Sequence, residues 1–307
     1  EGRRAYLGES FEAYYTELNR REVEAMTGKV VGKALKGESL EKEARKRFGN
    51  AVMNFTREER EVVLWMVGEY RKLLVEDFPL LANQPWQVIK VKGDHCGGFC
   101  HTRGLSVVIA EGALNRMVND YRRHGKSKKA LAGAGTIIVH EQIHVLQRCF
   151  PRKFTGLYTG AYGFIDGRVE QDEWVARNEI QNPDGLEGNR WVVDYEGNHY
   201  WLKTILDEND DPARMPASFR EAIMPLQKTG KTYRVIWRKG EKKPEVVDPN
   251  LMRDWKKQFP IRAGHDHPNE IFAYLFQSEL TRKIMEKEPS GDPMTKKTMA
   301  WARKELR

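Results

Sequence analysis

The chain has 307 residues, 40% of them hydrophobic, with eight tryptophans and eleven tyrosines. This composition indicates a folded globule and excludes an intrinsically disordered chain. No apolar run reaches the roughly eighteen residues that a membrane span requires. The net charge of +8 could indicate a nucleic-acid partner, but the basic runs are interleaved with acidic residues or lie at helix ends. We expect them to be solvated surfaces and predict no nucleic-acid binding.

The first third of the chain is predicted to be helical. Apolar residues recur at helical spacing from Phe11 to Leu35 and from Leu40 to Phe48. A capping box then opens a further helix from Arg57 to Glu76. We therefore expect residues 1–84 to form a helical N-terminal part.

Two segments rich in β-branched residues, Trp86–Val91 and Leu105–Ala110, are predicted to be strands. The loop that joins them carries Cys96 and Cys100, with a histidine on either side of the pair. Our first reading of this loop is a short disulfide in an oxidising compartment. Two free thiols and a second metal site are the alternatives, in that order.

A helix-length apolar run from Lys128 to Phe150 contains the motif H-E-Q-I-H, which spans His140 to His144. Residues four apart lie about 40° apart around a helix axis, so the two imidazoles project from one face. So placed, they can bind one Zn²⁺, and Glu141 lies beside them to take a proton from a water on the metal. The alternative is a pair of core histidines. An accidental motif is expected in only about one or two per cent of such sequences, which favours the metal.

A catalytic zinc also needs a third protein ligand. The motif helix does not supply one, because the third histidine of the metzincin pattern is absent after His144. The downstream segment His265–Leu280 can supply it, since Pro268 can open a helix that carries Glu270 in its first turn. Three other candidates for the third ligand stay open: Glu179, His265 and His267.

The motif at His140–His144, followed by the pattern Asn-Glu-x-x-Ala at Asn269–Ala273, resembles the gluzincins. These are zinc peptidases whose third ligand is a glutamate on a second helix. The resemblance implies that His140, His144 and Glu270 hold Zn²⁺. The chain departs from the family in one respect, because Glu270 lies 126 residues after His144 (270 − 144), which is longer than the usual gluzincin spacing.

The resemblance also implies the fold. We expect an α+β, predominantly helical, zincin-like catalytic fold in which a small twisted sheet packs over the motif helix. In that fold, the strand upstream of the motif helix would form the edge of the cleft and pair with an extended substrate. Leu105–Ala110 is the candidate for this strand, although its apolar sequence also suits an interior strand.

The long spacing between the two motifs is explained by a predicted insertion. A hairpin is predicted over Trp191–Leu202 and more strand material over Tyr233–Trp237. Residues 186–248 are therefore predicted to be a β-rich insertion. The whole chain, residues 1–307, is predicted to form a single zincin-like catalytic unit.

The function predicted from these features is that of a zinc-dependent hydrolase, and of a metallopeptidase in particular. Its substrate would be a peptide or a protein, and Glu141 would act as the general base. The alternative is a zincin-fold binding or regulatory protein that holds zinc without efficient turnover. No feature of the sequence indicates the oligomeric state.

The sequence begins at Glu1 rather than at methionine. We therefore expect an upstream segment to have been removed. A cleaved signal peptide would make the protein secreted or extracytoplasmic. Without a signal peptide, a cytoplasmic location is expected.

Overall fold

The computed structural model describes residues 2–8, 14–185, 188–206, 209–214 and 219–307. Helices account for 51% of the chain and strands for 17%, so the α+β class expected from the sequence is confirmed. The strands form one sheet of four and one of six. No helix in the described ranges is both long enough and apolar enough to cross a membrane.

The N-terminal part is helical, as expected, except that one predicted helix is wrong. The start of the predicted helix Phe11–Leu35, at residues 11–13, lies outside the described residues. The rest is not one continuous helix, because Asn19 starts a new helix with a capping box of its own and Gly28 ends that helix in the left-handed conformation, with φ 62°. The capping box predicted farther along is present, with Glu59 N donating to Thr56 Oγ1. The helices described here are α1 (Gly2–Tyr6), α2 (Tyr14–Glu17), α3 (Arg20–Thr27), α4 (Glu38–Ala51), α5 (Arg57–Leu74) and α6 (Pro79–Ala82).

The smaller sheet has the strand order β1-β2-β4-β3. Its strands are β1 (Val52–Met53), β2 (Gln87–Val91), β3 (His101–Arg103) and β4 (Ser106–Ala110). The predicted strand over Leu105–Ala110 corresponds to β4, and it is the interior strand that its apolar sequence also suited, not the strand at the edge of the cleft. It pairs with β2 on one side and β3 on the other, and all five of its residues are buried. Gly104, with φ 55°, turns the chain back so that three residues of the cysteine loop form the edge strand.

The cysteine loop contains no disulfide, so our first reading of it was wrong. Cys96 and Cys100 are free thiols, and burial raises the pKa of each to about 12, which keeps both protonated. The flanking histidines are satisfied by one hydroxyl, since Tyr6 Oη lies 2.8 Å from His95 Nε2 and 3.0 Å from His101 Nε2. Neither histidine belongs to a metal-binding cluster among the residues that the structure describes.

The larger sheet has the order β5-β7-β8-β9-β10-β6. The predicted hairpin is present and turns at Glu196 and Gly197, both with positive φ. The sheet begins before the predicted insertion, residues 186–248, because β5 and β6 precede it. Its strands are β5 (Phe164–Asp166), β6 (Arg168–Val169), β7 (Trp191–Tyr195), β8 (Asn198–Leu206), β9 (Phe219–Thr229) and β10 (Thr232–Val235).

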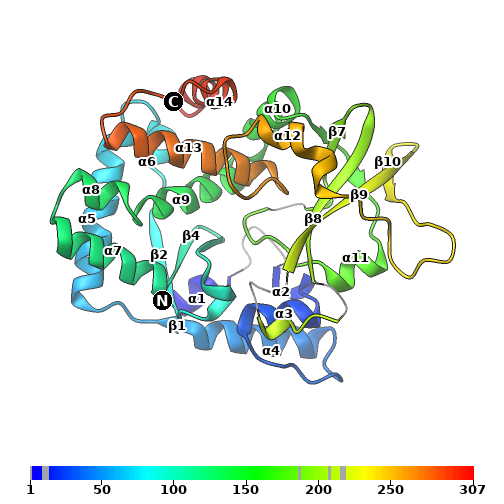
Figure 1. The fold of residues 1–307 in the computed structure, drawn as a ribbon. Coiled ribbons are helices and arrows are strands. Elements are labelled where there is room, and N and C mark those ends of the chain that lie inside the picture. Colours follow the sequence, from blue (N-terminus) through cyan, green and yellow to red (C-terminus); the bar gives the residue numbers. More distant parts are fainter. Residues whose placement is uncertain (1, 9–13, 186–187, 207–208, 215–218) are drawn as a thin grey trace.

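The remaining helices include the two that carry the sequence motifs. They are α7 (Glu111–His124), α8 (Lys128–Ala132), α9 (Thr136–Cys149), α10 (Pro151–Ala161), α11 (Glu173–Asn178), α12 (Arg253–Lys257), α13 (Pro268–Ile284) and α14 (Pro293–Glu305), with short 3₁₀ turns η1 (His95–Gly98), η2 (Pro212–Arg214) and η3 (Pro249–Met252). Figure 1 shows α13 running beside α9, with α5 and α7 on one side of the molecule and the larger sheet on the other. The apolar side chains of α9 and α13 belong to one core, which also contains residues of β4 and α5.

Two glycines should respond in opposite ways to substitution by alanine. At Gly135, before α9, an added Cβ would lie 2.7 Å from Met66 Sδ and from Tyr70 Oη, so Gly135→Ala should destabilise the protein by about 1–3 kcal/mol. Gly68, inside α5, has no neighbour within 4 Å of such an atom, so Gly68→Ala should stabilise it by about 0.5–1 kcal/mol. Urea unfolding measures the change in the free energy of unfolding for both variants. Equal changes in the two variants would contradict the close packing described at the start of α9.

Candidate metal centre

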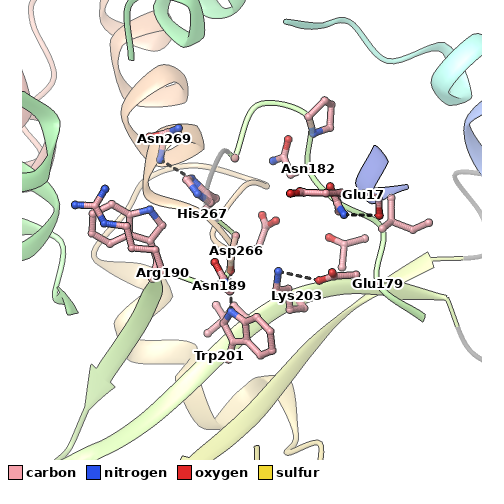
Figure 2. Close-up of a pocket in the computed structure, with 18 of the residues that line it drawn as sticks. Glu17, Glu179, Asn182, Asn189, Arg190, Trp201, Lys203, Asp266, His267 and Asn269 are labelled. Carbon is pink, nitrogen blue, oxygen red and sulfur yellow. Dashed lines mark hydrogen bonds and ion pairs between the residues drawn. The ribbon is translucent and has the colours of Figure 1, made fainter. Parts of the chain in front are cut away.

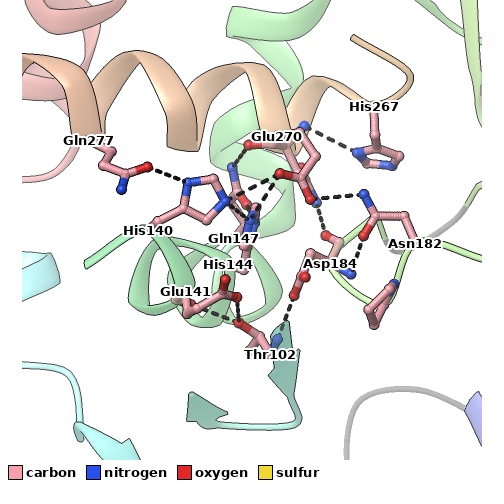
Figure 3. A network of polar contacts seen from close by, with 12 residues as sticks. Thr102, His140, Glu141, His144, Gln147, Asn182, Asp184, His267, Glu270 and Gln277 are labelled. Atoms are coloured by element: carbon pink, nitrogen blue, oxygen red, sulfur yellow. Dashed lines mark hydrogen bonds and ion pairs between the residues drawn. The ribbon is translucent and has the colours of Figure 1, made fainter. Parts of the chain in front are cut away.

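Helices α9 and α13 bring three potential metal ligands together (Figure 3). His140 and His144 project from one face of α9, and their Nε2 atoms lie 3.1 Å apart. Glu270, in the first turn of α13, places its Oε2 atom 3.3 Å from His140 Nε2 and 3.7 Å from His144 Nε2. All three side chains are buried. The structure therefore gathers two imidazole nitrogens and one carboxylate oxygen around one point.

Each imidazole is oriented by a glutamine. His140 Nδ1 lies 3.1 Å from Gln277 Oε1, and His144 Nδ1 lies 2.7 Å from Gln147 Oε1. The orientation of the Gln147 amide is fixed, because its Nε2 atom donates to the carbonyl oxygen of Asn269. An amide oxygen only accepts hydrogen bonds, so Nδ1 carries the proton in both rings. The Nε2 lone pairs are then left for a metal, as in metal sites whose histidines are held by outer partners.

The charges of the three side chains are coupled. Burial alone would raise the pKa of Glu270, but the two histidines outweigh it and hold that pKa well below its usual value. Burial alone would lower the pKa of His144, but the carboxylates of Glu270 and Asp184 outweigh it and raise the pKa to about 9. In the metal-free protein, His144 is therefore protonated at neutral pH.

Glu141 lies beside this cluster and is also buried. Its Oε2 atom is 3.1 Å from Thr102 Oγ1, on the edge strand β3. Burial raises the pKa of Glu141 well above its usual value, and the nearby carboxylate of Asp184 raises it further. A carboxylate with such a raised pKa holds a proton readily, which is the property required of a general base that later acts as an acid.

The other candidates for the third ligand lie elsewhere. Glu179 Oε2 forms an ion pair with Lys203 Nζ at 2.9 Å. His267 caps α13, since its Nδ1 accepts from the backbone of Asn269. His265 packs its ring against aromatic side chains. None of the three belongs to a potential metal cluster in the ranges that the structure describes.

Asp184 is the main residue of the site that the sequence analysis missed. Its carboxylate, with Glu141 and His144, forms a second group whose ligand atoms all lie within 4.8 Å of one another. The neighbouring Asn182 donates from Nδ2 to Glu270 Oε1 at 2.8 Å. The sequence Asn-Pro-Asp-Gly at 182–185 is typical of a turn, and nothing in it indicates where that turn lies in the fold.

A cavity of about 710 Å³, shown in Figure 2, shares lining residues with the surroundings of the three potential ligands. Gln147, Asn182 and Asn269 line it, and Gln147 and Asn182 also hydrogen-bond to His144 and Glu270 respectively. Its other walls come partly from the larger sheet, which contributes Trp201 and Lys203 of β8. The cavity is large enough for several residues of a peptide, and it combines aromatic side chains with charges of both signs.

Two imidazoles and one carboxylate are the donor set of catalytic zinc sites, which keep a further position open. The residues present therefore fit this metal. The chain matches no protein-family model, and comparisons with curated proteins and with solved structures find no match. The geometry of the site therefore carries the functional argument.

Zinc uptake by the metal-free protein should release protons. The pKa of His144 is raised to about 9, so its imidazole is protonated at neutral pH and must lose that proton before Nε2 can bind a metal. The apparent zinc affinity should rise about tenfold per pH unit as the pH approaches that pKa. Calorimetry in buffers of different ionisation enthalpy counts the protons released. Fewer should be released near pH 10 than near pH 7, and equal proton release at both values would contradict this assignment.

Proposed function

We propose that the protein is a zinc-dependent hydrolase with a zincin-like fold, and specifically a metallopeptidase. The observation that carries the proposal is the meeting of His140, His144 and Glu270. Glu270 is far from the histidines in sequence, yet its carboxylate faces both Nε2 atoms. An accidental H-E-x-x-H motif gives no reason for a buried carboxylate at this point, nor for a glutamine partner on each Nδ1 atom.

The chemistry divides between the metal and Glu141. His140, His144 and Glu270 would hold a zinc ion, which would supply a water of lowered pKa and would polarise a carbonyl oxygen. Glu141 receives the proton of the attacking water and passes it to the leaving amine. Its burial and the hydrogen bond from Thr102 keep its carboxylate aimed at one place. Gln147 and Gln277 hold the histidine rings still.

Two features favour a peptide as substrate. The edge strand β3 runs past Glu141, and a strand edge offers backbone groups that can pair with an extended peptide. The cavity of about 710 Å³ can accept side chains of such a peptide. The gluzincin resemblance of the two motifs implies the same substrate class.

A zinc-holding binding or regulatory protein without efficient turnover is the second candidate. It is favoured by Asp184, whose carboxylate lies beside Glu141 and His144, where it competes with a substrate for space. Glu141, the glutamate required for turnover, nevertheless lies buried beside the potential ligands. Hydrolysis therefore remains the function that the site supports best.

The ligand set is tested by metal content. The purified protein should bind about one zinc per chain, and His140→Ala, His144→Ala or Glu270→Ala should each lower zinc affinity more than about a hundredfold, since a ligand is lost. Glu179→Ala is the matched control, because it removes a buried glutamate that has its own ion pair and lies outside the cluster. Full zinc occupancy in the Glu270 variant, by atomic absorption, would remove the gluzincin-like assignment.

The role of Glu141 is tested separately from metal binding. Glu141→Gln should keep its zinc but lose hydrolysis of a mixed peptide library by about 10²–10⁴-fold, since an amide cannot accept the proton. Glu58→Gln, at a partly exposed position in the first turn of α5 where the side chain pairs with Arg122, should change neither property. Substantial activity in Glu141→Gln would mean that another group acts as the base.

A further inference from the structure

The edge of β3 is already occupied by side chains. Thr102 lies opposite Val107 of β4, and its own backbone groups face the other way. Its N–H donates to Asp184 Oδ1 at 2.7 Å, and its carbonyl oxygen accepts from Arg148 Nη2 at 3.2 Å. These are the donor and the acceptor that an added strand would use. An extended peptide cannot pair with Thr102 while both groups are bound.

Asp184 belongs to the turn Asn182–Gly185, which lies against the metal centre and is called the blocking turn below. Asn182 Nδ2 donates to Glu270 Oε1 at 2.8 Å, and Asn269 Nδ2 donates to the carbonyl oxygen of Asp184 at 3.0 Å. Arg148 also donates to the carbonyl oxygen of Pro183. Figure 3 shows Asp184 between Glu270 above and Thr102 below. The turn thus bridges the edge strand and the ligand helix.

The contacts described above for the blocking turn are hydrogen bonds. Pro183 is its only apolar side chain, and it is partly exposed. A hydrogen bond from the protein can be exchanged for one to a ligand with little net change in free energy, whereas packed apolar surface cannot be exposed so easily. The turn can therefore be displaced by a ligand that offers the same donors and acceptors to Thr102 and Arg148.

The chain just before the turn is held more firmly. Glu22 of α3 accepts from the backbone N–H of Gln181 at 2.6 Å, and Asn19 Nδ2 donates to the carbonyl oxygen of Glu179 at 3.1 Å. Ile180 N donates to the carbonyl oxygen of Thr204, in β8. Movement would therefore begin after Gln181.

We propose that the blocking turn is an autoinhibitory segment that occupies the place of a substrate main chain at β3. An extended peptide binds when it takes over the backbone groups of Thr102 and displaces Asp184 from Glu141 and His144. This inference rests on the proposed function, because it describes a closed state of the same site, in which the blocking turn excludes the substrate. Asp184 then controls the access of a substrate to the site and takes no part in the chemical step.

Peptide binding without turnover tests the proposal. In the zinc-loaded Glu141→Gln protein, Asp184→Ala should bind a fluorescein-labelled random decapeptide library at least about tenfold more tightly, because the N–H of Thr102 is freed. Gly185→Ala should act in the same direction without removing a polar group, since its Cβ would lie 2.7 Å from the ring of His267, the cap of α13, and would disturb the contacts by which Asn182 and Asn269 hold the turn against that helix. Hydrogen exchange of the β3 segment should be faster in both variants and slow again when peptide is added.

Asp292→Ala is the matched control. Asp292 accepts a backbone N–H bond at 2.7 Å, from Thr295 at the start of α14, as Asp184 does from Thr102. The Asp292→Ala variant should lose about as much stability as the Asp184→Ala variant, but its affinity for the peptide should not change. The proposal is overturned if neither the Asp184 nor the Gly185 variant binds peptide more tightly while zinc content is intact. Tighter binding by these variants, together with no cleavage by protein that retains Glu141, would uphold the blocking turn and refute the hydrolase.

Discussion

The packing of α13 against α9 is the constraint on which the site depends. It carries the carboxylate of Glu270 to the Nε2 atoms of His140 and His144 inside the protein. Buried ionisable groups are costly unless they neutralise one another, so small errors in this packing would leave a charge without its partner. Ala273, one turn after Glu270, is fully buried, and Gly264 passes where a Cβ would lie 2.8 Å from Glu270 Cβ. The absence of a side chain at Gly264 lets the loop before α13 lie directly against Glu270 and Tyr274.

The features that could be predicted from the sequence have local causes. The Thr56 capping box, the hairpin at Glu196–Gly197 and the helix that carries His140 and His144 each depend on residues within a few positions of one another. The convergence of Glu270 with the histidines was expected only through the resemblance of two short motifs. Composition and periodicity give no measure of the distance between two helices.

The features that could not be predicted depend on distant contacts or on very short elements. The edge strand β3 has three residues, too few to show a period, and it forms because Gly104 reverses the chain. Thr102 and Asp184 are 82 positions apart in sequence. The Asn-Pro-Asp-Gly sequence specifies a turn whatever lies beside it, so its place over the metal centre is decided by partners such as Asn269 and Arg148.

The separation of the ligands along the chain has a consequence for the order of folding. His140 and His144 lie one turn apart on α9, but Glu270 lies on α13, which comes after the strands β7 to β10 of the larger sheet in the chain. Closing so long a loop is entropically unfavourable until the surrounding core compensates for it. A metal ion therefore cannot act as an early nucleus, as it does in small zinc-dependent modules. The core shared by α9 and α13 has to assemble first, so an ion bound by these three residues would enter a scaffold that is already folded.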